Sequence, residues 1–148
     1  MTNKTEARGA TPLLQRVLLL DLVGTGGFAL ILILAAGWLA APLGLGEAFL
    51  RVTGLLLVPF CGLVAAVARA AGDPLSPPRA GVRAILTLNA GWIVASIGIL
   101  FTGWIQPTTM GQVFIAAQAV LVLVFAELQM IALKRANRMH PAGAKAAA

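Results

Sequence analysis

The chain has 148 residues, of which 59% are hydrophobic and only 11% are charged, and its mean hydropathy is +0.93. A soluble domain of this length needs a charged surface, and these proportions cannot provide one. The net charge of +6 does not indicate nucleic-acid binding, because the basic residues form no face interleaved with aromatic residues. Basic residues beside apolar segments are typical of membrane proteins, where they contact anionic lipid headgroups.

The chain has one cysteine, Cys61, and one histidine, His140, which lies in the polar C-terminal segment. A quinone-linked thiol oxidase needs an exchanging cysteine pair, and a di-haem cytochrome needs several axial ligands. A zinc site needs at least three ligands held together. None of these sites can be built from this inventory, so three classes of four-helix membrane enzyme are excluded and no cofactor is expected.

Four apolar segments follow a polar N-terminal tail, residues 1–16. They cover residues 17–39, 49–68, 84–104 and 112–133, and a basic tail, residues 134–148, ends the chain. At ~1.5 Å per residue, each segment can cross a hydrocarbon core of ~30 Å. Because a bilayer offers no water to backbone groups, each segment is predicted to be helical. The predicted fold is therefore an all-α bundle of four transmembrane helices, made of two helical hairpins, with a disordered C-terminal tail.

Basic residues are concentrated on one side of this predicted bundle. Ten of them lie before the first segment, between the second and third, or after the fourth, whereas the opposite side has only Arg51, at the start of the second segment. The positive-inside rule then predicts that both termini lie in the cytoplasm, in a bacterial inner membrane. Trp38 and Trp104 close the opposite ends of the first and third segments, where indole rings favour the interface.

The two halves of the sequence align when one is shifted by 66 residues. Residues 31–38 then lie over 97–104, and Arg69-Ala70 lies over Arg135-Ala136. One interpretation is a tandem duplication of a hairpin, which would relate the halves by an axis along the membrane normal. The alternative is that helices ending outside favour Trp and helices ending inside favour Arg, whatever their origin. Both interpretations stay open at this point.

Three helices are predicted to carry a polar side chain at one depth in the membrane. Asp21, Asn89 and Glu127 lie five, six and seven residues from Arg or Lys residues at the cytoplasmic boundary, or about 8, 9 and 10 Å inside it. An ionisable group at the centre of a span costs ~2.5–3.5 kcal/mol, so each needs a reason. The cluster either forms a small polar site for protons or a cation, or holds the bundle together through mutual hydrogen bonds.

The third and fourth segments each show a packing face. Asn89, Trp92 and Ser96 share one face of the third. A second stripe on the fourth segment consists of Gln118, Val122, Phe125 and Gln129. Glu127 lies nearly opposite Gln118 on the same helix, so these two side chains cannot belong to one site. Core packing is the expected role of Trp92 and Gln118.

Two further residues bear on helix packing. Gly24 lets a neighbouring helix approach the first segment closely, as small residues do in membrane interfaces. Pro59 interrupts the second segment in the middle and removes the hydrogen bond to the carbonyl of Leu55, which predicts a kink. Transporters use such breaks for gating, but passive helices carry them as well.

Three short motifs resemble those of small bacterial integral membrane proteins that carry no assigned activity. They are residues 88–92 (Leu-Asn-Ala-Gly-Trp), residues 107–111 (Pro-Thr-Thr-Met-Gly) and Gln118-Ala119. In size and topology the chain is also similar to four-helix DoxX-type proteins. The resemblance implies a four-helix membrane fold and no catalytic residue.

Three function classes are compatible with the sequence. The favoured one is a structural or accessory membrane component that binds protein or lipid partners through its helices. Its partners would be membrane lipids and a second copy of the chain or another membrane protein. The alternative is a small oligomeric transporter or channel that uses Asp21 or Glu127. A lipid-modifying enzyme has the least support, because no nucleophile–base pair or metal-ligand set is visible.

Overall fold

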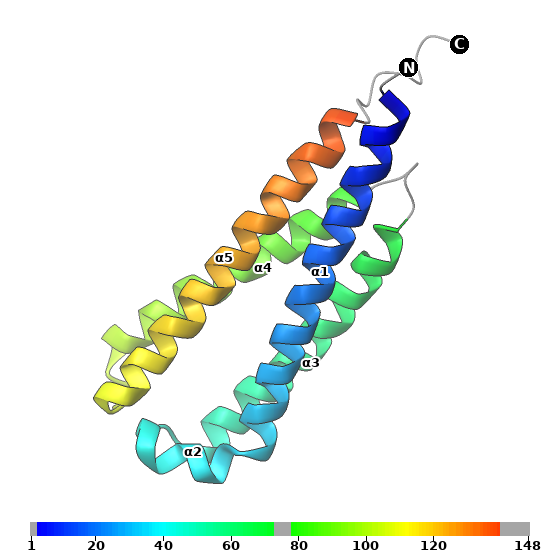
Figure 1. Ribbon diagram of the computed structural model, residues 1–148. Coiled ribbons are helices and arrows are strands. Elements are labelled where there is room, and N and C mark those ends of the chain that lie inside the picture. Colours follow the sequence, from blue (N-terminus) through cyan, green and yellow to red (C-terminus); the bar gives the residue numbers. More distant parts are fainter. Residues whose placement is uncertain (1–2, 73–77, 140–148) are drawn as a thin grey trace.

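Five helices make up almost all of the described part of the chain, which is residues 3–72 and 78–139 of the computed structural model (Figure 1). In chain order they are α1 (Asn3–Leu34), α2 (Ala36–Leu43), α3 (Glu47–Ala70), α4 (Arg79–Thr102) and α5 (Thr109–Met139). All except α2 contain an apolar stretch long enough to cross a membrane, and no strand occurs among the described residues. The predicted all-α fold with four transmembrane helices is confirmed.

Helices α1 and α5 both extend beyond the predicted apolar segments. Helix α1 begins at Asn3, inside the segment expected to be a tail, and α5 continues to Met139, past the predicted end at Leu133. Hydropathy locates only the apolar part of a helix, whereas the backbone hydrogen bonds continue into polar residues. The prediction of a disordered C-terminal tail is therefore corrected for residues 134–139. The rest of that tail, and residues 73–77, lie outside the described part of the chain.

The predicted first span does not continue to Leu39. Helix α1 ends at Leu34, and the chain turns at Ala35 into the short helix α2, which lies across the end of the bundle (Figure 1). Helix α2 ends at Leu43 and is followed by Gly44, whose φ of 63° is left-handed. A Cβ atom there would also lie 2.7 Å from the backbone nitrogen of Thr108, so glycine is needed on both counts.

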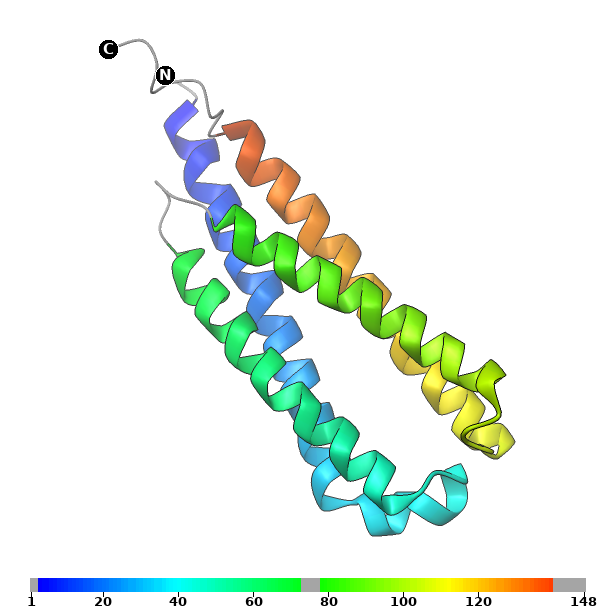
Figure 2. The same cartoon turned by 180° about the vertical axis from the view of Figure 1, so that it is seen from behind.

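The long helices form two hairpins, α1 with α3 and α4 with α5, and the hairpins meet mainly where α1 packs on α5. Helices α3 and α4 are close where α3 ends and α4 begins, and they diverge toward the other end (Figure 2). Within the first hairpin α3 approaches α1 closely at Gly54, where a Cβ would lie 2.9 Å from the carbonyl oxygen of Ala29. Between the hairpins, α4 approaches α3 closely at Gly81, where a Cβ would meet Val67 at 2.6 Å. Small residues thus set the helix spacing, as is usual in membranes.

The buried apolar residues form two separate clusters. One lies at the end of the bundle where the chain begins and ends, and includes Leu18, Val64 and Ile85. The other lies toward α2, and includes Leu32, Leu50 and Ile115. Large apolar side chains are also exposed along all four long helices, with Val23, Leu34, Val94 and Phe101 each more than 70% exposed. A surface of this kind fits contact with lipid chains rather than water.

Candidate functional site

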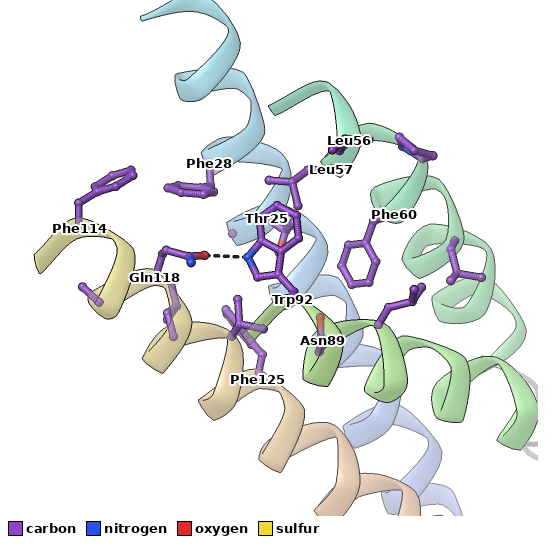
Figure 3. A pocket seen from close by; sticks show the side chains of 17 residues that line it. Thr25, Phe28, Leu56, Leu57, Phe60, Asn89, Trp92, Phe114, Gln118 and Phe125 are labelled. Atoms are coloured by element: carbon purple, nitrogen blue, oxygen red, sulfur yellow. Dashed lines mark hydrogen bonds between the residues drawn. The ribbon is translucent and has the colours of Figure 1, made fainter. Parts of the chain in front are cut away.

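A pocket with a volume of about 590 Å³ lies between the two apolar clusters, and all four long helices contribute to its walls. Figure 3 shows side chains from these helices pointing into it around Trp92. Its lining is mostly apolar and is rich in aromatic rings, namely Phe28, Phe60, Trp92, Phe114 and Phe125. Small-molecule sites are typically concave and apolar, with volumes of about 300–1,000 Å³ and a few polar groups. The pocket has these properties.

The pocket exists because α4 leaves the bundle partway along its length. The buried residues of α4 are Val82, Ile85 and Asn89, all in its first half, and beyond Asn89 its side chains are partly or fully exposed. Leu56 of α3 and Leu88 of α4, each more than half exposed, form part of the rim where these helices separate. The pocket is therefore accessible from the apolar surface of the bundle.

A hydrogen-bond network crosses from α4 to α5 at the pocket wall. The indole Nε1 of Trp92 donates to Oε1 of Gln118 over 2.9 Å (Figure 3). Nε2 of Gln118 donates in turn to the hydroxyl of Ser96 over 2.8 Å. The predicted shared face of Trp92 and Ser96 thus faces Gln118 across the helix interface. Each of these three side chains is paired within the protein.

Asn89 also lines the pocket, one helical turn from Trp92, and it is only 4% exposed. Its Nδ2 atom is buried and has no hydrogen-bond partner among the described residues. A buried polar group without a partner costs about 1–3 kcal/mol, so it needs an explanation. Asn89 does not pair with Asp21, as one reading of the sequence had allowed.

Asp21 lies next to the pocket and is 2% exposed. Its carboxylate accepts hydrogen bonds from the hydroxyl of Thr25 at 2.8 Å and from Nε2 of Gln129 at 2.7 Å. Gln129 is fully buried, and its Oε1 atom has no partner among the described residues. Thr25 also lines the pocket, so it connects the pocket to the carboxylate. Among residues 13–72 and 78–138, no basic side chain forms an ion pair with Asp21; the ion pair at the start of α3 joins Arg51 and Glu47.

The structure places Glu127 outside the predicted polar cluster with Asp21 and Asn89. Its side chain is exposed on α5, and Gln129, two residues further on, is the residue that reaches Asp21. Two residues along an α-helix correspond to a rotation of about 200° around the helix axis. Because Gln129 points into the bundle, Glu127 must point away from it. Asp21, Asn89 and Glu127 were grouped because they lie at the same depth in the membrane. Which residue of α5 faces the interior depends instead on its angular position around the helix axis.

The remaining predicted residues lie around the pocket. Helix α3 is continuous through Pro59, which lines the pocket and is exposed. Gly24 also lines it, and a Cβ there would lie 3.5 Å from the ring of Phe125, an ordinary contact. Sequence reasoning did not assign Thr25 or Gln129 to the site. The stripe that contains Gln118 and Gln129 carried the signal for Gln129, because the whole stripe faces inward.

The described residues contain no group of three His, Cys, Asp or Glu side chains that could hold a metal ion. No family model, curated protein or solved structure matches this chain.

Proposed function

We propose that this protein is an accessory component of the bacterial inner membrane that binds a lipid-class molecule between its two helical hairpins. The observation that carries the proposal is the apolar pocket of about 590 Å³, whose rim opens on the lipid-facing surface. A ligand dissolved in the bilayer could enter such a pocket without passing through water. The aromatic walls provide large apolar contact areas, which favour rings and acyl or prenyl chains.

We propose in addition that both ends of the bundle-forming chain face the cytoplasm. Four spans bring the start of α1 and the end of α5 to the same end of the bundle (Figure 1). The excess of Lys and Arg at that end supports its cytoplasmic placement.

Trp92 offers a direct probe of ligand binding. The other tryptophans, Trp38 and Trp104, are 89% and 87% exposed, so replacing both with Phe leaves Trp92 as the only indole. Bromine atoms quench indole fluorescence on contact. A dibrominated C18 fatty acid methyl ester, added to this variant in mild detergent, should therefore quench Trp92 emission saturably if the pocket binds lipids.

Two matched variants separate the pocket from the outer surface. Ala117 lines the pocket, whereas Ala116, its exposed neighbour on α5, does not. Ala117→Phe should fill part of the pocket and lower the apparent affinity for the brominated ester, measured from the quenching curve, at least fivefold. Ala116→Phe should leave it unchanged. Quenching that does not saturate, or that both variants alter equally, would contradict the proposal.

A second candidate function is ion-coupled transport through Asp21. The observation that favours it is a carboxylate 2% exposed in a membrane span, with no ion pair to a basic side chain among residues 13–72 and 78–138. Such groups often mark proton or cation pathways. Proteoliposomes with a trapped pH-sensitive dye would report proton flux, and Asp21→Asn should abolish it in folded protein. Flux no greater than that of protein-free vesicles would reject this candidate.

A further inference from the structure

A second, smaller cavity of about 190 Å³ adjoins the pocket on the side toward α2. It continues along α3 and α4 and reaches Leu45, Phe49 and Ile99 near the α2 end of the bundle. The two cavities have five lining residues in common, namely Phe28, Leu56, Trp92, Phe114 and Gln118. The site therefore extends from the middle of the bundle to its α2 end.

Both cavities open on the gap between α3 and α4. Where they meet, the rings of Phe28 and Phe114 lie with their centroids 5.6 Å apart, and Trp92 is hydrogen-bonded to Gln118. Both contacts involve α5, so they narrow the junction from the α5 side only. On the α3 side the junction is formed by Leu56, which is 61% exposed. The cavities thus form one continuous groove, which we call the hairpin groove and which is lined by the residues of both.

The hairpin groove is closed at the end away from α2. The last lining residue of α3, Leu63, packs against the buried cluster that contains Val64 and Ile85, where α3 and α4 come together. Toward α2 these two helices diverge (Figure 2), and no residue of α4 beyond Asn89 is buried. A chain-like ligand therefore has access from the α2 side and along the gap, but not from the other end.

The dimensions of the hairpin groove fit a lipid chain rather than a helix. Along α3 the groove runs from Phe49 to Leu63, or ~21 Å at ~1.5 Å per residue, about the length of an extended palmitoyl or stearoyl chain. A helix of that length, ~10–12 Å across, fills on the order of 2,000 Å³, far more than the cavities of about 590 and 190 Å³. A helix from a second copy of the chain is therefore too large for it.

The lining of the hairpin groove also restricts which part of a lipid it holds. Among the residues that the structure describes, neither cavity is lined by Asp, Glu, Lys, Arg or His. A phosphate placed inside would lose its hydration without gaining a counter-charge. The groove therefore suits the chain of a membrane lipid and excludes its charged headgroup.

We propose that the hairpin groove binds one acyl chain of a phospholipid from the leaflet at the α2 end. The headgroup stays at the membrane interface near α2, and the chain runs past Trp92 toward the closed end at Phe125. The second acyl chain stays in the bilayer, because the gap is open to lipid beside Leu56 and Leu88. This assignment rests on the proposed lipid-binding function and names the class, the leaflet and the direction of the lipid.

Blocking each half of the hairpin groove tests whether one chain occupies both cavities. Ala95 lines only the smaller cavity and Ala117 only the larger one, whereas Ala90, exposed on α4, lines neither. The probe is a phosphatidylcholine with one dibrominated stearoyl chain, measured by quenching of Trp92 in the variant without Trp38 and Trp104. Ala95→Phe and Ala117→Phe should each lower its apparent affinity at least fivefold, and Ala90→Phe should leave it unchanged. Equal affinities for Ala95→Phe and Ala90→Phe would overturn the assignment of one chain to both cavities.

Two reporter positions test the direction of the chain. Phe49 lies at the α2 end of the hairpin groove, and Phe125 lies at the closed end. With all three native tryptophans replaced by Phe, the substitutions Phe49→Trp and Phe125→Trp each provide a single indole. Bromines near the carboxyl end of the probe's stearoyl chain should quench the indole at position 49 at least threefold more than that at position 125, and bromines near the methyl end should reverse this order. Only the saturable part of the quenching is compared, because unbound probe quenches in proportion to its concentration.

The outcomes separate this assignment from the proposed function. If the dibrominated methyl ester quenches Trp92 saturably but the phosphatidylcholine does not, lipid binding stands and the phospholipid assignment is overturned. If neither probe quenches saturably, both proposals fail. Stronger quenching at position 125 by bromines near the carboxyl end would reverse the direction and overturn the leaflet. The blocking variants keep the native Trp92, so they test the assignment even when a reporter variant misfolds.

Discussion

The buried pair of Asp21 and Gln129 allows a quantitative test of what joins α1 to α5. Replacing Asp21 with Asn and with Leu removes the same negative charge, so the difference between these two variants reports only the hydrogen bonds. Asparagine can keep both partners. Its oxygen accepts from Thr25, and its nitrogen can donate to Oε1 of Gln129, which has no partner among the described residues of the wild type. Asp21→Asn should therefore be at least as stable as the wild type.

Leucine at position 21 should be less stable than asparagine. Gln129 is fully buried, and it would lose its partner at Nε2 while its Oε1 stays unpaired. An orphaned buried polar group costs about 1–3 kcal/mol. Thr25 adds little to this cost, because a helical threonine can bond the carbonyl four residues before it. For a chain of this size, the difference corresponds to about 2–12 °C in melting temperature.

Thermal unfolding of the purified variants in mild detergent measures this difference. The double variant Asp21→Leu/Gln129→Leu should recover most of the lost stability, because it removes both ends of the broken pair. Equal melting temperatures for Asp21→Asn and Asp21→Leu would refute the reasoning. If both fall well below the wild type, the carboxylate charge itself stabilises the protein, and a bound cation becomes the better explanation.

Three further predictions concern packing and topology. Gly54→Ala should be about 1–3 kcal/mol less stable than Gly62→Ala in thermal unfolding. The reason is that a Cβ at Gly54 meets α1 at 2.8 Å, whereas a Cβ at Gly62 has nothing within 4 Å. Equal stabilities of the two variants would contradict the close approach of α3 to α1. Thr108 caps α5 by accepting from the third amide of the helix at 3.1 Å, so Thr108→Val should cost about 1 kcal/mol, while Thr109→Val should cost little. Reporter fusions at the C-terminus should read as cytoplasmic and fusions near Gly44 should not, and a periplasmic C-terminus would reject the proposed orientation.

The fold could be predicted from the sequence because membrane spans depend on length and apolarity, which are local properties. Helix α2 could not be predicted in this way. The residues around the turn at Ala35 are as apolar as those before it, and the proline of this region, Pro42, lies inside α2 rather than at the turn. The turn depends instead on tertiary contacts, since the backbone oxygens of Pro42 and Leu43 accept hydrogen bonds from Thr108 at the start of α5.

The candidate site was partly visible in the sequence. Asp21 and Asn89 were singled out because polar groups are costly in a span, and both are indeed buried. Glu127 was grouped with them by depth, although the helical periodicity of α5 already placed Gln129 on the inward face. Glu127 is charged but lies on the exposed face of α5, whereas the amide of Gln129 lies on the buried face and contacts Asp21. Angular position is therefore the stronger criterion when several residues lie at the same depth.

The pocket could not be predicted, because it results from an unequal packing of the two hairpins. Helix α1 packs closely along α5, whereas α3 touches α4 mainly near Gly81 and then separates from it. At the other end the hairpins are joined through α2, where the hydroxyl of Thr108 donates to the carbonyl of Pro42 at 2.7 Å. These two residues are 66 positions apart, the same shift that aligns the halves of the sequence. Residues near an axis that relates two duplicated hairpins contact their own counterparts. The duplication stays a prediction. If it is correct, the contact of α1 with α5 and the contact of α3 with α4 were once equivalent, and the pocket lies beside the looser of the two.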